Sequence, residues 1–160
     1  VAGLGVSALQ GLISEILNMD AKDFKSLVET RIILERNSAA MAAERRTEDN
    51  IRKIRLALDN YKSRVNMGLS TVEEDLMFHL EIAEASQNHI LKSMMMVIIP
   101  DIINNYKKYD VCAEDGLTKN RFEEHEQILE HIINKNSEGA LKAMENHLHD
   151  IKQFSLTNKI

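Results

Sequence analysis

The sequence contains a single cysteine, a single proline and no tryptophan among its 160 residues. Because Cys112 stands alone, no disulfide bond can form within the chain, which suits a reducing compartment. One proline and six glycines leave few places for tight turns or helix breaks. Hydrophobic residues make up 44% of the chain and helix-forming residue types are abundant, so we expect one all-α domain with its own core.

Long apolar segments are also missing. No run of apolar residues approaches the roughly twenty that a membrane-spanning helix requires. The start of the chain lacks the basic and then apolar pattern of a secretion signal, so we expect a cytoplasmic protein without membrane contact. The net charge of −5 repels the phosphates of nucleic acids, which predicts that this chain alone binds DNA poorly.

Helix start and stop signals divide the chain into about seven helical segments. The predicted segments are 7–19, 20–46, 47–65, 70–86, 90–109, 118–134 and 137–154. Thr47 is followed by side-chain acceptors, and Ser70 with Glu73 predicts a capping box for the fourth segment. Ser137 is the expected cap of the last segment. Short loops between helices of this length predict a mostly antiparallel bundle around a shared core.

Ionisable residues on the buried side of a helix are informative, because they need a partner or must stay neutral. In the fourth segment, Asp75 and His79 project from the apolar face that Leu76 marks. These two side chains are four residues apart along the helix. They therefore stack one turn apart and can chelate a single ion.

Two further histidines occupy apolar faces in the last two segments. His125 lies in the same arc as Leu129, and His147 fills a gap in the apolar seam that Met144 continues. Each of these residues alone is more often a hydrogen-bonded core residue than a ligand. Three imidazoles and one carboxylate directed into one bundle are costly if unpaired, and a divalent cation satisfies all four together.

Nitrogen and carboxylate ligands without thiolate suit Zn, Ni, Fe, Co or Mn, and we expect zinc first. A di-iron carboxylate bundle needs Glu-x-x-His pairs, whereas Leu76, Phe122 and Met144 stand three residues before the histidines. A zincin helix needs His-Glu-x-x-His, which the sequence also lacks. The sequence therefore predicts a mononuclear site and leaves the identity of the metal open.

Arg31 and Glu35 form another inward pair, on the same helix face as Leu27. The pair is either a partly buried salt bridge or, in Arg31, a donor fork for the carboxylate of a ligand. Without further information the salt bridge is favoured.

Several of these residues lie in motifs of a known family. The motifs are RIILE at 31–35, AAMAA at 39–43, DLMFH at 75–79 followed by Asn88, and MENHL at 144–148. In this order and spacing, and with His125 between the last two, they resemble the FadR-type C-terminal domain, abbreviated FCD, of GntR-family transcription regulators. The resemblance covers about residues 8 to 155.

The resemblance implies an antiparallel bundle of six or seven helices that binds a small organic acid as effector and forms a homodimer. Many members hold a divalent metal through one Asp and three His, and the matching residues are Asp75, His79, His125 and His147. Residues that match Arg31 and Asn88 often line the effector cavity in the family. We expect these two, together with Glu35, to bind the effector.

The resemblance also implies a domain organisation. We expect residues 1–7 to be the remnant of a wing or linker from a missing winged helix-turn-helix domain, and residues 8–160 to be the effector-binding and dimerisation domain. Operator DNA is then bound only through the missing domain. We expect a regulator and not an enzyme. Two alternatives stay open, a metal-dependent hydrolase or isomerase that Glu35 assists as a base, and a bundle with a purely structural metal.

Overall fold

The computed structural model describes residues 24–109, 111 and 121–157. Its helices are α2 (Phe24–Arg45), α3 (Glu48–Asn66), α4 (Val72–Ala85), α5 (His89–Lys108), α6 (Arg121–Ile133), α7 (Ser137–His147) and α8 (His149–Thr157). All regular secondary structure in these ranges is helical, which confirms the predicted all-α class. The expected linker at 1–7, the expected helix at 7–19 and Cys112 lie outside the described residues.

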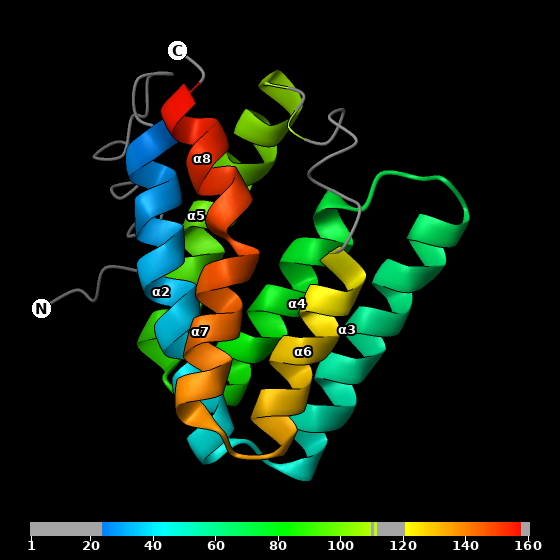
Figure 1. The fold of residues 1–160 in the computed structure, drawn as a ribbon, viewed down its shortest axis with the longest axis vertical. Coiled ribbons are helices and arrows are strands. Elements are labelled where there is room, and N and C mark those ends of the chain that lie inside the picture. Colours follow the sequence, from blue (N-terminus) through cyan, green and yellow to red (C-terminus); the bar gives the residue numbers. More distant parts are fainter. Residues whose placement is uncertain (1–23, 110, 112–120, 158–160) are drawn as a thin grey trace, which may run out of the picture.

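The helices form an antiparallel bundle. From α2 to α7 they run alternately down and up in Figure 1, and α8 continues beyond α7. α2 packs along α7 although the two are far apart in the sequence, and α3 packs against both α4 and α6. This arrangement confirms the bundle that the short loops predict.

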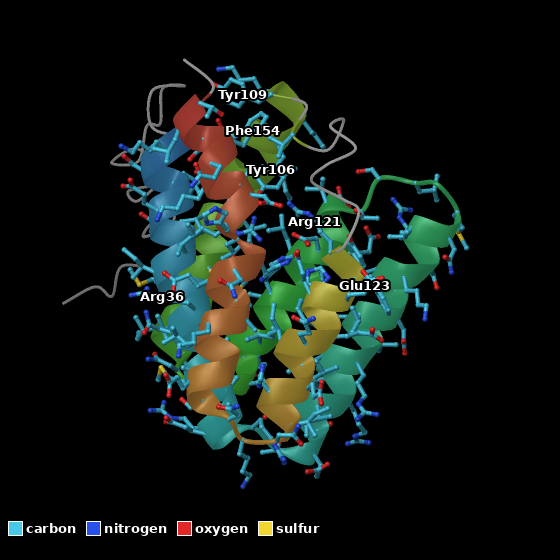
Figure 2. All side chains as sticks on the ribbon, in the orientation of Figure 1. Arg36, Tyr106, Tyr109, Arg121, Glu123 and Phe154 are labelled. Carbon is cyan, nitrogen blue, oxygen red and sulfur yellow. The ribbon has the colours of Figure 1, made fainter. Side chains whose placement is uncertain are left out.

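Helix α2 is central to the packing, because α4, α5, α6, α7 and α8 all contact it. Ala39, Ala42 and Ala43 of this helix are fully buried, and their small side chains let neighbouring helices approach closely. At the other end of α2, Phe24 packs against the rings of three aromatic residues in the upper part of Figure 2, which are Tyr106, Tyr109 and Phe154. α2 therefore passes through the core and can present polar side chains deep inside it.

The helix starts confirm part of the capping predictions. Thr47 and Asn50 form a reciprocal capping box at the start of α3, and Gly68, with a φ of 64°, follows its end in the left-handed region. The box expected at Ser70 is wrong. α4 begins after Thr71, whose side chain makes no capping hydrogen bond, and the carbonyl of Ser70 instead accepts a hydrogen bond from Arg64.

The last predicted helix, 137–154, is also wrong in part. The structure divides it at Leu148 into α7 and α8. Its cap is Asn136 and not Ser137, because the Asn136 side chain accepts the hydrogen bond from the N–H of Gly139. Among the described helices, none combines the length and apolarity needed to cross a lipid bilayer.

Candidate metal centre

The four residues that the sequence predicts as ligands lie together inside the bundle. They are Asp75 and His79 of α4, His125 of α6 and His147 of α7, and all four are buried. One potential ligand atom from each residue lies within 4.8 Å of the others. We call these four residues the Asp–His cluster.

Distances within the Asp–His cluster are short. Nε2 of His125 lies 3.1 Å from Oδ1 of Asp75, and Nε2 of His79 lies 3.8 Å from Oδ2 of the same carboxylate. The ring centroids of His125 and His147 are 4.4 Å apart, and those of His79 and His147 are 5.1 Å apart. Ligands about 2.1 Å from a shared ion are separated by about 3 to 4 Å, so the cluster has a suitable size.

The surroundings of the buried histidine nitrogens indicate whether a metal ion fits the cluster. Nε2 of His79, His125 and His147 are all inaccessible to solvent, and none meets the geometry of a hydrogen bond to the described residues, although that of His125 lies 3.1 Å from Oδ1 of Asp75. A buried polar atom without a partner costs stability, and three together are unusual. A divalent cation would satisfy all three lone pairs together with the carboxylate of Asp75.

Two carboxylates contact the outer nitrogens of the histidines. Oε2 of Glu35 lies 2.5 Å from Nδ1 of His79, and Oε2 of Glu124 lies 2.8 Å from Nδ1 of His147. In both rings Nδ1 therefore faces a carboxylate from outside the cluster, while Nε2 of His79 lies 3.8 Å from the carboxylate of Asp75 within it. Carboxylates commonly contact the second ring nitrogen of metal-binding histidines.

Arg31 lies beside the cluster and is only 1% exposed. Its Nε donates a hydrogen bond of 2.6 Å to Glu35, and its Nη1 donates one of 2.5 Å to the hydroxyl of Tyr106. Nη2 lies 3.5 Å from Oδ2 of Asp75 and makes no hydrogen bond to the described residues. The predicted salt bridge between Arg31 and Glu35 is present, and it is fully buried.

A second guanidinium approaches the same carboxylate. Nη1 of Arg121, at the start of α6, lies 3.6 Å from Oδ1 of Asp75. Figure 2 labels Arg121 and Tyr106 in the same region of the bundle. Asp75 therefore lies between two positively charged side chains and two histidines.

Burial and neighbouring charges set the ionisation of the cluster. Burial lowers the pKa of His147 well below its usual value, and His125 and His79 lower it further. Burial also lowers the pKa of His125, although Asp75 opposes this effect. For Asp75 burial alone would raise the pKa, but His79, His125 and Arg121 outweigh it and hold the pKa well below the usual range. A neutral imidazole and an ionised carboxylate are the forms that bind metal.

Asn88, expected to bind the effector, has a different contact in the structure. Its side-chain oxygen accepts hydrogen bonds from the N–H groups of Ile90 and Leu91, so it caps α5. α4 ends at Ala85, six residues beyond His79 and about 9 Å further along the helix axis. The structure therefore brings Arg31 and Glu35 to the Asp–His cluster and leaves Asn88 at the end of α4.

The sequence prediction missed four residues around the cluster, which are Tyr61, Tyr106, Arg121 and Glu124. Two of them carried a usable signal. Tyr106 continues the buried stripe of Ile98 and Ile102 at four-residue intervals, and Arg121 stands four residues before His125. Glu124 carried none, because its contact with α7 depends on how two helices pack.

Comparisons with known proteins agree with the fold and the motifs. The FCD domain family matches residues 26–150. The transcriptional regulator LutR of Bacillus subtilis is 32% identical over 143 residues, which cover 88% of this chain and 65% of that protein. The Uxu operon transcriptional regulator of Escherichia coli is 32% identical over 139 residues, covering 84% of this chain and 54% of that protein.

Among solved structures, GntR of Streptococcus agalactiae superposes with a TM-score of 0.73 at 25% identity, covering 89% of this chain and 64% of that one. The chain thus spans between about half and two thirds of the length of these relatives. The relatives found by sequence are regulators by name, which supports a regulatory domain rather than an enzyme. With a family match over most of its length and a matching bundle, the chain belongs to the FCD domain family.

Proposed function

We propose that this chain is the ligand-sensing and dimerisation domain of a bacterial DNA-binding transcription regulator. In this proposal Asp75, His79, His125 and His147 hold a divalent metal, with zinc as the first choice and Ni, Fe, Co or Mn as the others. A small carboxylate effector binds at this metal. The observation that carries the proposal is the convergence of three buried histidines and one buried carboxylate, whose potential ligand atoms all lie within 4.8 Å of one another.

The charge around the site favours an anionic ligand. With a divalent ion present, the ion and the guanidinium groups of Arg31 and Arg121 place positive charge around Asp75. Buried positive charge is stabilised by an anionic partner, which favours a ligand with a carboxylate. A bound divalent metal with an open coordination position supplies the Lewis-acid contact for one carboxylate oxygen.

The structure refines the proposed role of Arg31. Nε and Nη1 are already engaged by Glu35 and Tyr106, so a two-pronged fork is not available to a ligand. Nη2 makes no hydrogen bond to the described residues and faces Asp75. We propose that Nη2 alone donates to the effector, while Glu35 and Tyr106 hold the guanidinium in place.

The regulatory part of the proposal rests on the relatives. LutR is described as a helix-turn-helix-type regulator and is longer than this chain. We propose that residues 8–160 sense the effector, that residues 1–7 are linker, that the domain forms a homodimer and that a separate DNA-binding domain contacts operator DNA. The effector must bind two states of the dimer with different affinity, because equal affinity shifts no equilibrium.

A thermal-shift screen tests the metal and the effector together. The chain is stripped with a chelator, reloaded with Zn²⁺ or Ni²⁺, and mixed with a panel of small carboxylic acids. We expect the metal to raise the melting temperature, and one or more acids to raise it further only in the loaded protein. His125→Ala should abolish both shifts, whereas the exposed His89→Ala should retain them.

Two results of this screen would contradict the proposal. If neither these ions nor Fe²⁺, Co²⁺ or Mn²⁺ are taken up, the Asp–His cluster is not a metal site. If the metal stabilises the chain but no acid in a broad panel adds to it, the metal is structural and the chain is not a sensor of carboxylates at this site.

A further inference from the structure

We propose that Glu35 and Glu124 are positioning residues that fix His79 and His147 in the form whose Nε2 binds the metal. This inference rests on the proposed metal site, and it assigns a function to two side chains that supply no ligand atom themselves. Oε2 of Glu124 forms a hydrogen bond of 2.8 Å with Nδ1 of His147, and Oε2 of Glu35 lies 2.5 Å from Nδ1 of His79 as an ion pair.

The chemistry of a neutral imidazole explains why a carboxylate matters. The ring carries one proton, on Nδ1 or on Nε2, and only the nitrogen without it can bind a metal. A carboxylate beside Nδ1 favours the proton on that nitrogen, since it accepts the hydrogen bond. The Nε2 lone pair then points toward the other members of the Asp–His cluster, and the ring is held in the required orientation.

Each carboxylate acts between two helices. Glu35 comes from α2 and reaches His79 of α4, while Glu124 comes from α6 and reaches His147 of α7. Glu124 also directly precedes His125, so α6 supplies one ligand and orients a ligand on the neighbouring helix. These two contacts connect α2 with α4, and α6 with α7, before any ion binds.

His125 is held in a different way. Its ring packs against Phe78 with centroids 4.5 Å apart and meets Tyr61 edge-on at 4.9 Å. Its Nε2 lies 3.1 Å from Oδ1 of Asp75 within the cluster, but its Nδ1 has no partner among the described residues. Packing therefore orients this ring, and the inference predicts carboxylate dependence for His79 and His147 but not for His125.

Glu124 offers the cleaner experiment. Glu35 is fully buried and also pairs with Arg31, so replacing it disturbs two interactions. The side chain of Glu124 is 35% exposed, so its replacement should leave the fold intact. Glu123, the exposed neighbour labelled in Figure 2, is a matched control with the same charge on the same turn of α6.

The test compares Glu124→Ala, Glu124→Gln, Glu123→Ala and the unmodified chain. Zn²⁺ affinity is measured by competition with a chromophoric chelator, and ¹⁵N–¹H correlation spectra of the metal-free proteins report which nitrogen of each histidine carries the proton. We expect Glu124→Ala to weaken Zn²⁺ binding by about 10- to 100-fold and to reduce the Nδ1–H form of His147 alone. Glu124→Gln, whose amide oxygen can still accept the bond, should lose less, and Glu123→Ala should stay within about twofold of the unmodified chain.

The outcomes separate this inference from the function it rests on. If the unmodified chain binds Zn²⁺ and Glu124→Ala binds it equally well with unchanged His147 signals, the positioning role is wrong and the metal site stands. If the unmodified chain binds none of Zn²⁺, Ni²⁺, Fe²⁺, Co²⁺ and Mn²⁺, both are wrong. Glu35→Gln provides the second arm, in which the signals of His79 should change and those of His125 should not.

Discussion

Arg31 is a charged residue buried inside the bundle, and the stability of the fold depends on the few contacts that its guanidinium group makes. The hydroxyl of Tyr106 accepts a hydrogen bond from Nη1 at 2.5 Å, and both residues are buried. Tyr106→Phe should lower the free energy of unfolding by about 1–3 kcal/mol, because it leaves a buried charged donor without its acceptor. Urea denaturation monitored by circular dichroism measures the change.

Tyr109 provides the matched control for this substitution. Its hydroxyl is also buried but has no hydrogen-bond partner in the part of the chain that the structure describes. Tyr109→Phe should therefore be neutral or slightly stabilising. If both variants lost the same free energy of unfolding, the hydrogen bond between Tyr106 and Arg31 would not contribute specifically to stability.

The pH dependence of stability follows from the histidines. Burial holds the pKa of His147 well below, and that of His125 below, the value of about 6.5 expected in the unfolded chain. Below that pH the unfolded state binds protons that the folded state does not, so acidification favours unfolding. The metal-free chain should lose stability as the pH falls from 7.5 to 5.5.

Carboxylates extend this trend to lower pH. Arg31 and His79 hold the pKa of Glu35 below its usual value although burial opposes them, and the pKa of Asp75 is lowered as well. Their contribution is lost as the pH falls below about 4. Burial raises the pKa of Glu124, which acts in the opposite direction but more weakly in a partly exposed group.

A constant or rising free energy of unfolding between pH 7.5 and 5.5, measured by urea titration, would show that the buried histidines are not held neutral.

The residues of the site were predictable to the extent that one helix determines them. Asp75, His79, His125 and His147 each interrupt an apolar face with a period of 3.6 residues, and the structure brings all four together. Glu124 could not be found in this way. Its partner lies on another helix, and the distance between them depends on helix packing rather than on sequence spacing.

For single helices, the sequence predicts that a helix is present more reliably than it predicts the residues at which the helix begins and ends. The predicted helix at 137–154 contains two helices, and its cap is one residue earlier than expected. Ser and Asn are both good cap residues, so Asn136 and Ser137 compete for the same role. Backbone geometry decides the outcome, because only Asn136 reaches the N–H of Gly139, at 2.9 Å, whereas the Ser137 hydroxyl donates to Glu44.

This correction can be measured at the level of the helix. Asn136→Ala removes the cap of α7 and should lower the free energy of unfolding by about 1 kcal/mol. Ser137→Ala removes only a hydrogen bond near the surface and should change it by less than about 0.5 kcal/mol. Chemical denaturation of the two variants measures the difference. A larger loss of free energy of unfolding in Ser137→Ala would mean that Ser137 is the cap, as the sequence predicted.

At the scale of the whole molecule, the antiparallel bundle and the order of its helices were easier to predict than the number and boundaries of the helices. Scarce proline and glycine, apolar stripes and short connections all indicate an antiparallel bundle. The central place of α2 was not predicted. It depends on the close approach that Ala39, Ala42 and Ala43 permit, and it explains why Arg31 and Glu35 reach a cluster formed by three other helices.

A metal shared by α4, α6 and α7 should act on the stability of the entire bundle. The ligand atoms come together only in the folded chain, so metal binding free energy adds to the free energy of unfolding. With free Zn²⁺ at about a thousand times its dissociation constant, we expect a gain of about 4 kcal/mol. The urea midpoint should rise, while the slope of the transition should stay constant because the same surface is exposed on unfolding.

Histidine variants show whether this gain belongs to the Asp–His cluster. In His147→Ala the midpoint should be nearly independent of Zn²⁺, whereas His149→Ala, whose exposed side chain lies outside the cluster, should respond like the unmodified chain. Comparing each variant with and without Zn²⁺ removes the effect of the substitution on intrinsic stability. An equal shift of the urea midpoint by Zn²⁺ in the two variants would mean that the ion binds elsewhere, because His147→Ala removes the ligand that α7 supplies to the cluster.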